Sequence, residues 1–399
     1  MPGSTRSYEM AKRLVKMGHE VTIITSQTNA GKEGATIKTN EDGICVYWLA
    51  VPYSNSMSYN RRIMAFIKFA YESYKTAITI PADLIFASST PLTIALPGVY
   101  AARKLKVPFV FEVRDLWPDL PIAVGAIRNG VLKKLAYRLE KFAYVNSDAI
   151  VALSDGMKKG IMSTGYPGNK ISVIPNASDL ERFDPLKPRK RQLREQYGIP
   201  KDAIVILYAG TFGVINGVEY LMKLAAEFIN DKRIFFLTVG GGQQFEFVKN
   251  VAVTNGTLGR NVLMFEKVSK IEVSAFFECA EMAISTVIPL PELEANCANK
   301  FFDALAAGCC MVINHKGWQA ELLESSGAGF SLSFDITTAK KELQEWLNEP
   351  RKIFQAGKIA RDIAEKMFDR NILAQQLEAE LIKVYEQKKD KLNQHHIHL

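Results

Sequence analysis

The spacing of apolar and polar residues switches between two periods along the chain, and each period predicts one kind of element. In the first half, short apolar runs rich in β-branched and aromatic residues predict strands at 20–25, 43–49, 84–87, 108–113, 149–153 and 171–174. Between them, apolar residues that recur every three or four positions predict helices at 7–17, 61–77, 92–105, 131–146 and 155–163. Strands that alternate with helices are typical of a doubly wound α/β fold.

The same pattern restarts in the second half, after a charged stretch that contains Pro185, Pro188 and Pro200. Strands are predicted at 204–209, 234–239, 261–265, 282–286 and 311–314, with helices from about 217 and 299 and a helical tail from 350. We therefore predict two Rossmann-like domains, residues 1–180 and 181–365. Residues 366–399 are expected to form a C-terminal helix that packs back toward the first domain and ends in a frayed tail.

The chain opens with an incomplete structural unit. A turn with Ser and Thr as candidate caps leads into the helix at 7–17, and Gly18 ends that helix before the strand at 20–25. A turn, a helix and a strand form the second part of a βαβ unit. The pattern raises the question of where the first strand of this unit lies.

The net charge of +8 lies in the first half, where residues 1–179 hold 22 Lys and Arg against 14 Asp and Glu. A basic half favours an anionic partner, such as a phosphorylated substrate or a membrane surface. No RNP motif or zinc finger supports nucleic acid as a partner. The basic and apolar tract at 59–70 could lie on an anionic bilayer, or it could be an ordinary surface helix that faces the core.

Five scattered cysteines without a CxxC pair fit free thiols in a reducing compartment, and Cys309 and Cys310 are expected to fill a buried strand. The uncharged stretch at 84–102 contains Pro91, Pro97 and Gly98, which divide it into a strand, a turn and a short helix. No signal-peptide pattern is present at the start. We expect a cytoplasmic protein, peripheral on the inner face of the cytoplasmic membrane.

Two glycine-rich turns follow predicted strands in the second half. The first runs from Gly210, Thr211 and Gly213 to Asn216, and the second is formed by residues 240–242. Backbone amides at such a turn can approach a phosphate, and the following helix N-terminus favours negative charge. The alternative is a purely structural turn, because neither sequence matches G-x-G-x-x-G or a Walker motif.

A lysine and an aspartate occupy the first turn of the helix that begins near Asn299. Lys300 and Asp303 lie three residues apart, and Asn296 or Asn299 is expected to cap the helix. A cation beside free helix amides suits a diphosphate, and a carboxylate one turn further suits the hydroxyls of a ribose. The alternative is a surface Lys–Asp ion pair on an ordinary helix.

Charged residues also gather at the carboxyl end of the strand at 108–113, where Arg114, Asp115 and Trp117 follow Glu112. Charges at this end of a strand are poor core residues and good site residues. Asp115 could serve as a base or as a ligand of an acceptor hydroxyl. The alternative is an Arg–Asp ion pair that shapes the loop.

Several segments together resemble the GT-B fold glycosyltransferases of family 4. They are NKFFDALAAG at 299–308, GWQAEL at 317–322, RDLWP at 114–118, IPN at 174–176 and PGSTRSYEMA at 2–11, and they look like the L-fucosamine (O-antigen) transferase subgroup. The resemblance extends to about residue 385. It implies two Rossmann-like domains that face each other across a cleft, with the nucleotide-sugar in the second and the acceptor in the first. It also implies retention of anomeric configuration without an obligatory metal or a cofactor.

The resemblance assigns roles to individual residues. It implies that Lys300 and the amides around Asn299 bind the diphosphate and that Asp303 binds the ribose. It places Gly210, Thr211, Gly213 and Asn216 in the donor loop, and Gly3 in a loop that closes over the phosphates. Arg114, Asp115 and Trp117 would bind the acceptor. The expected catalytic residues are Asp115, Lys300 and Glu294.

The chain departs from the family pattern at three points. The family carries a motif of two glutamates. The position of the first glutamate is occupied here by Ala295, and Glu294 lies one residue earlier. Asp303 replaces the second glutamate. Thr211 and Asn216 stand where family members often carry Arg and Lys, which makes Lys300 more important. Met1 falls inside a loop that a β-strand precedes in the family. We therefore expect the first N-terminal strand to be missing from this chain, as a strand and loop of roughly 15–20 residues.

Together these features predict a retaining glycosyltransferase. It would move a hexosyl or N-acetylhexosaminyl group from a nucleotide donor, expected to be UDP, to a lipid-linked or polysaccharide precursor of O-antigen or another cell-surface polysaccharide. Two alternatives stay open. One is a nucleotide-sugar epimerase of the same fold, and the other is a degenerate protein that binds a nucleotide without catalysis.

Overall fold

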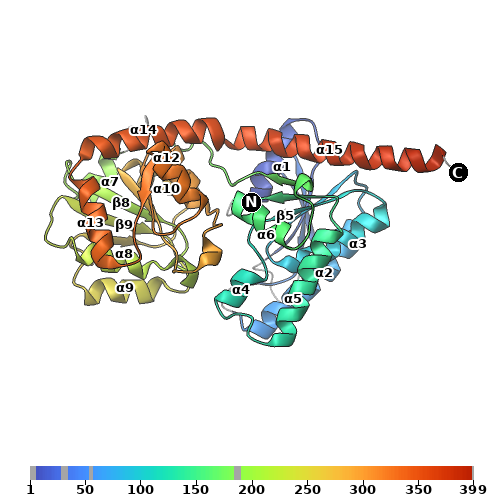
Figure 1. Ribbon diagram of the computed structural model, residues 1–399, viewed down its shortest axis with the longest axis horizontal. Helices are drawn as coiled ribbons and strands as arrows, with labels where there is room; N and C mark the ends of the chain where they lie inside the picture. The colour runs from blue at the N-terminus through green and yellow to red at the C-terminus, as the bar shows by residue number, and fades with distance from the viewer. Residues whose placement is uncertain (1–5, 28–34, 54–56, 184–189, 398–399) are drawn as a thin grey trace. The chain divides into compact units, whose positions relative to one another are not determined.

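The computed structural model describes residues 6–27, 35–53, 57–183 and 190–397 (Figure 1). Contacts between residues divide the chain into two units. The first contains Met1–Pro175 and Asn371–Leu399, and the second contains Asn176–Arg370. The sequence placed the corresponding boundaries at 180 and 365.

A four-stranded parallel sheet forms the larger part of the first unit. Its strand order is β4-β5-β6-β7, and the bounds are β4 Ile85–Ser88, β5 Phe109–Val113, β6 Ala149–Ala152 and β7 Ile171–Val173. Every residue of β5 and β6 is buried, as expected for parallel strands covered on both faces. The accompanying helices are η1 Leu92–Ile94, α3 Ala95–Leu105, α4 Asp119–Ala123, α5 Gly130–Val145, α6 Asp155–Ser163 and η2 Gly168–Lys170. The uncharged stretch at 84–102 therefore forms a strand, a turn and helices, as predicted.

The first unit contains a second, three-stranded sheet. Strand β1 (Thr22–Ser26) pairs in parallel with β3 (Ile44–Leu49), and β2 (Ile37–Glu41) pairs with β3 in antiparallel orientation. Helix α1 (Arg6–Lys16) packs on this sheet through Tyr8 and Ala11, and α2 (Tyr59–Ala77) follows β3 along the chain. Strand β2 was not predicted from the sequence, because it is polar and largely exposed and lacks the apolar run that marks the other strands.

The C-terminal helix α15 (Arg370–Ile397) belongs to the first unit from Asn371 onward. Glu378 contacts the ring of His19 at 2.7 Å, and Lys388 forms an ion pair with Asp148 at 3.1 Å. Each of these two contacts joins α15 to a residue that lies more than 200 positions earlier in the sequence. No helix within the described residues is long and apolar enough to cross a membrane.

The second unit is a doubly wound parallel sheet. Its strand order is β10-β9-β8-β11-β12-β13, which is the Rossmann order. The strands are β8 Ile204–Ala209, β9 Ile234–Val239, β10 Val262–Phe265, β11 Met282–Ser285, β12 Cys310–Ile313 and β13 Gly329–Ser331. The predicted bounds of β8 and β9 are confirmed, whereas the three-residue edge strand β13 was missed. Cys309 and Cys310 are both buried, as expected.

Helices cover both faces of this sheet, and Figure 1 shows its strands between α8 and α9 below and α10 and α12 above. The helices of the second unit are α7 Lys190–Gln196, η3 Val214–Asn216, α8 Glu219–Ala226, α9 Phe245–Thr254, α10 Lys270–Glu278, η4 Pro291–Leu293, α11 Asn299–Ala306, α12 Trp318–Ser326, α13 Ile336–Leu347 and α14 Pro350–Met367. The strand order reverses at β8, which has β9 on one side and β11 on the other. Ligands of open α/β sheets bind outside the carboxyl ends of the strands at such a reversal.

Candidate functional site

The loop after β8 lies at this reversal point and carries the glycines that the sequence singled out. It leaves the sheet at Gly210 and turns through η3 before α8 begins. The Phe212 N–H donates to the Gly241 carbonyl at 3.0 Å, and the Gln244 N–H donates to the Phe212 carbonyl at 2.8 Å. The two glycine-rich turns therefore support each other through backbone hydrogen bonds.

Gly240 shows why the second turn needs glycine. Its φ is +154°, and a Cβ atom at this position would overlap the carbonyl oxygen of Gly210. A side chain here would push the first loop away from the end of β8. The turn at 240–242 thus has a structural role, which is one of the two interpretations that the sequence left open.

Lys300 reaches across to the loop after β8. Its Nζ donates to Asn216 Oδ1 at 3.0 Å and to Tyr208 Oη at 3.1 Å, and it lies 4.4 Å from the centre of the Tyr208 ring. Its aliphatic stem passes Gly210, where a Cβ atom would lie 3.5 Å from Lys300 Cδ. The structure thus brings together Gly210, Asn216 and Lys300 from three separate sequence positions.

The ammonium of Lys300 donates to two neutral partners, Tyr208 and Asn216. Within the ranges that the structure describes, no carboxylate oxygen lies within 4 Å of its Nζ, so the alternative of a surface ion pair with Asp303 is wrong. Burial lowers the pKa of Lys300 to about 7, because the charged form has lost water without gaining a counter-ion. An anion bound beside Nζ would stabilise the charged form and raise the pKa of Lys300 again.

The N-terminus of α11 lies next to this lysine in the sequence. The N-cap residue is Ala298, whose side chain makes no capping bond, so the prediction that Asn296 or Asn299 caps the helix is wrong. Asn299 is the first helical residue and is exposed, whereas the Asn296 carbonyl accepts a hydrogen bond from Trp318 Nε1 at 2.9 Å. A helix start without a side-chain cap keeps its first amides available for an anion.

Asp303 contacts a different element from Lys300. Its Oδ1 accepts a hydrogen bond from Ser178 Oγ at 2.8 Å, and Ser178 is fully buried. The Ser178 N–H donates to the Phe368 carbonyl, which fixes the serine against the end of α14. One face of α11 therefore presents an oriented carboxylate one turn beyond the lysine.

Glu294 is exposed after η4, and its backbone carbonyl lies against Gly317, whose φ is +95°. His315 is buried in the loop between β12 and α12 and contacts the Lys316 carbonyl through Nδ1 at 2.8 Å. Burial lowers the pKa of His315, the charge of Lys300 lowers it further, and Glu294 opposes the change. The charges of Lys300 and Glu294 therefore act on the pKa of His315 in opposite directions.

Three residues of this site were not found from the sequence, namely Tyr208, Ser178 and His315. Tyr208 lies inside an apolar run and reads as a core residue, and indeed its side chain is fully buried. The available signal was its position two residues before the glycine turn, at the carboxyl end of a strand. Ser178 and His315 carried no comparable signal.

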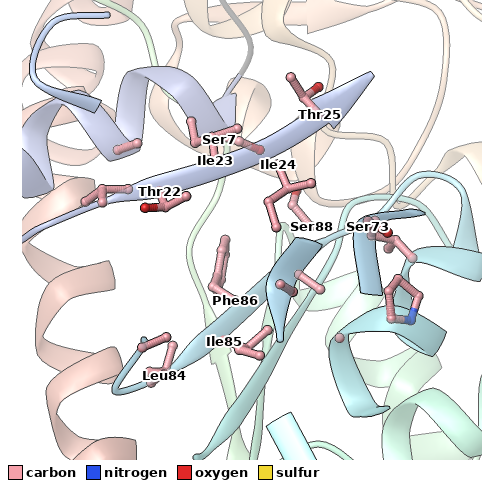
Figure 2. A pocket seen from close by; sticks show the side chains of 18 of the residues that line it. Ser7, Thr22, Ile23, Ile24, Thr25, Ser73, Leu84, Ile85, Phe86 and Ser88 are labelled. Carbon is pink, nitrogen blue, oxygen red and sulfur yellow. The ribbon is translucent and has the colours of Figure 1, made fainter. Parts of the chain in front are cut away.

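In the first unit, Arg114, Asp115 and Trp117 follow β5 and line one cavity of about 1440 Å³ (Figure 2). Asp115 is half-buried, and burial raises its pKa to about 6, which Arg114 opposes. Glu112 has a structural role, because it is buried with Arg6 at 2.7 Å and also accepts from Ser88 Oγ. Gly3 lies outside the described residues.

Comparison with known proteins agrees with this architecture. The model "Glycosyltransferase Family 4" matches residues 3–182, and the model "Glycosyl transferases group 1" matches residues 189–364. The chain belongs to the GT-B glycosyltransferases of family 4. The transferase is 24% identical over 388 residues to WcaI, a colanic acid biosynthesis glycosyl transferase of Escherichia coli K12, and the match covers 92% of this chain and 93% of WcaI.

Two solved structures share the fold of the transferase. WaaG, a glycosyltransferase involved in lipopolysaccharide biosynthesis, has a TM-score of 0.67 at 16% identity, and 94% of this chain and 95% of WaaG are covered. Anabaena Alr3699/HepE in complex with UDP and glucose has a TM-score of 0.69 at 16% identity, with 91% of this chain and 100% of that protein covered. At this identity the likeness concerns the fold.

Proposed function

We propose that this transferase is a retaining enzyme that moves a sugar from a UDP-sugar to a lipid-linked or polysaccharide precursor in cell-surface polysaccharide synthesis. The observation that carries the proposal is the ammonium of Lys300, which is held at the reversal point of the second sheet by Tyr208 and Asn216 and has no carboxylate within 4 Å in the described ranges. A desolvated cation at this position is complementary to a diphosphate.

The donor chemistry follows from this complementarity. When the sugar–phosphate bond breaks, negative charge grows on the leaving diphosphate. Lys300, the uncapped amides at the start of α11 and the loop at Gly210, Thr211 and Gly213 would stabilise that charge. Because these groups supply positive charge themselves, we propose that no metal is obligatory.

The remaining donor contacts extend along α11. Asp303, oriented by Ser178, would accept hydrogen bonds from the ribose hydroxyls. Glu294 is exposed near Lys300 and His315 and would contact the transferred sugar. UDP as the nucleotide is supported by the fold relative HepE, whose solved complex contains UDP and glucose.

The acceptor would bind in the first unit. Asp115, with its pKa raised to about 6, would be ionised at neutral pH and could accept a proton from the acceptor hydroxyl. Arg114 and Trp117 line the same cavity and would position the acceptor. The relatives WcaI and WaaG are named for colanic acid and lipopolysaccharide synthesis, which supports a cell-surface precursor as acceptor.

A membrane-facing surface is the last part of the proposal. Helix α2 exposes Met64, Ile67 and Tyr71 beside Arg61 and Lys68, and α5 exposes further apolar and basic residues, namely Val131, Leu132, Leu135, Lys134 and Arg138. Apolar residues interleaved with basic ones suit the surface of an anionic membrane. We therefore propose peripheral contact with the inner leaflet, where lipid-linked acceptors lie.

Ligand-dependent stabilisation tests the donor site. Thermal unfolding would be followed with UDP, GDP, ADP and CMP, for the natural chain and for Lys300→Gln. A ligand at 100 times its Kd adds about 2.7 kcal/mol to the free energy of unfolding, so we expect UDP to raise Tm by several degrees in the natural chain. A stabilisation that is unchanged in Lys300→Gln would contradict the donor site.

Product analysis separates the alternatives. A transferase releases UDP and forms a glycoside only when an acceptor is present, and we expect turnover to persist in EDTA. An epimerase would change the donor sugar without any acceptor. Nucleotide binding without loss of sugar from the donor would favour the non-catalytic alternative.

A further inference from the structure

One tyrosine connects two parts of the proposed donor site. Tyr208 lies in β8, two residues before Gly210, and its side chain is fully buried. Its hydroxyl donates to the Thr211 carbonyl at 2.7 Å and accepts from Lys300 Nζ at 3.1 Å. A single oxygen atom is therefore bonded both to the loop after β8 and to the lysine in the first turn of α11.

The direction of these two hydrogen bonds follows from the groups involved. A tyrosine hydroxyl has one proton and a backbone carbonyl can only accept, so the proton of Tyr208 points to Thr211. The oxygen then offers only its lone pairs to Lys300, which must be the donor. Burial raises the pKa of Tyr208 above its ordinary value, so the hydroxyl keeps this proton at neutral pH.

The same arrangement decides how many protons of Lys300 remain for a ligand. Tyr208 and Asn216 accept one N–H each, and Nζ has no further acceptor among the residues that the structure describes. A neutral amine has two N–H groups, which these acceptors satisfy, whereas an ammonium has three. In the charged form, the third N–H is therefore available to an anion.

The loop after β8 supplies further donors beside this lysine. The Thr211 carbonyl and the Phe212 N–H belong to one peptide unit. Tyr208 donates to that carbonyl, and the Gly241 carbonyl accepts from that N–H. The N–H groups of Thr211 and Gly213, on either side of this unit, have no acceptor within the described ranges. Fixing the peptide unit thus leaves free amides close to the ammonium, as an anion requires.

The ring of Tyr208 has a separate, structural role. It packs edge-on against the Phe212 ring in the core of the second unit, with 5.5 Å between the ring centres. Lys300 Nζ lies 4.4 Å from the centre of the Tyr208 ring, so the ring also contacts the cation. Replacing the tyrosine with phenylalanine would keep both ring contacts and remove only the hydroxyl.

We propose that Tyr208 is a positioning residue of the donor site, whose hydroxyl aligns Lys300 with the loop after β8 so that the third N–H of the ammonium is directed at the bound diphosphate. The inference rests on the proposed function, and it adds a residue that acts through Lys300 without touching the ligand. Because the hydroxyl accepts a hydrogen bond from the charged lysine, it also favours the charged form. Its removal should therefore weaken donor binding most at a pH where Lys300 loses its proton.

Binding of UDP to Tyr208→Phe tests the proposal. Tyr220→Phe is the matched control, since Tyr220 is also buried in the second unit and its hydroxyl also donates to a carbonyl, that of Ser333, at 2.7 Å. Calorimetric titration at pH 8 is expected to give a Kd about 10-fold higher for Tyr208→Phe and an unchanged Kd for Tyr220→Phe. Both variants should show a similar, small decrease in Tm, because each loses one buried hydrogen bond.

The pH dependence of binding separates positioning from packing. Loss of the hydroxyl should lower the pKa of Lys300 further, because the charged form loses a hydrogen bond. We expect the affinity of Tyr208→Phe for UDP to begin to fall about one pH unit below the point at which the affinity of the natural chain falls. The ionisation of UDP itself is the same for every chain, so it does not affect this comparison.

A double substitution shows whether Tyr208 acts through Lys300. If it does, Tyr208→Phe should change the Kd by less than about twofold in a Lys300→Ala chain. The same change of about 10-fold in both backgrounds would overturn the proposal, because the effect would then be independent of the lysine. An unmoved pH profile, or equal Kd values for Tyr208→Phe and Tyr220→Phe, would overturn it as well.

These outcomes are distinct from a failure of the proposed function. Each of them concerns Tyr208 alone and leaves the donor site in place. If the natural chain does not bind UDP, or if Lys300→Ala binds UDP as tightly as the natural chain, the donor site itself is contradicted, and the role of Tyr208 with it.

Discussion

Lys300 Nζ donates to Asn216 Oδ1 at 3.0 Å, across 84 residues of sequence. The resemblance places Asn216 where a basic residue is expected, so Lys300 is expected to supply more of the positive charge at this site. The amide oxygen of Asn216 orients the ammonium without neutralising it. We therefore expect donor binding in this transferase to depend strongly on Lys300.

Replacing this lysine tests its role directly. Lys300→Ala is expected to lower kcat on the order of 10²–10³-fold, since it removes one preorganised donor to the developing diphosphate charge. Far-UV circular dichroism and Tm should stay close to those of the natural chain. Lys232→Ala, which removes an exposed lysine elsewhere in the second unit, serves as the control. Equal turnover of the two variants would show that Lys300 does not contribute to the donor site.

The pH dependence of donor affinity follows from the same residue. With its pKa lowered to about 7, Lys300 loses its charge above neutrality in the free enzyme, and a bound diphosphate favours the charged form. Affinity for a UDP-sugar is therefore expected to be constant below pH 7 and to fall by up to tenfold per pH unit above it. Calorimetric titration from pH 6 to 9 measures this.

Lys300→Arg provides the control for that profile. A guanidinium stays protonated throughout this range, so any residual affinity of the variant should not change between pH 7 and 9. A profile with the same slope in the variant would mean that another group titrates.

Asp115 is expected to set the acidic limb of the activity profile. Its pKa is raised to about 6, so the carboxylate is protonated, and unable to accept a proton, as the pH falls through 6. kcat/KM should decline below that pH, and Asp115→Asn should lower kcat by about 10²–10⁴-fold at pH 7.5. Asp119→Asn, four residues further and exposed, should retain activity. Full activity of Asp115→Asn would exclude this base.

Gly240→Ala tests the support of the donor loop. The added methyl group would overlap the Gly210 carbonyl, and we expect a loss of about 3 kcal/mol or more in the free energy of unfolding. Gly256→Ala has a positive φ of +68° and open space around it, so it should cost only about 1 kcal/mol. Urea unfolding measures both values, and similar values would show that the contact with Gly210 is unimportant.

Vesicle flotation tests the membrane-facing surface. Ile67→Glu on α2 and Leu135→Glu on α5 should each weaken binding to vesicles with anionic lipid, because they replace an exposed apolar side chain with a like charge. Val253→Glu on α9 is equally exposed but lies in the second unit, and it should bind as the natural chain does. Equal binding of all four proteins, or none at all, would contradict this surface.

The α/β class, most helices and strands, and the position of Lys300 in the first turn of α11 could be predicted from the sequence alone. These features depend on local periodicity, on glycine turns and on residues within one helical turn, all of which are short-range properties. Strands β2 and β13 could not be predicted in this way, since a polar edge strand and a three-residue strand have too little periodic signal. The cap predicted for α11 was wrong, because loop geometry decides which residue caps a helix.

Which residues distant in the sequence contact each other depends on how the elements pack in three dimensions. Lys300 contacts Tyr208 across 92 residues and Asp303 contacts Ser178 across 125 residues, and no local pattern encodes either pairing. The lowered pKa of Lys300 is likewise a consequence of burial, which depends on how the loop after β8 packs on α11.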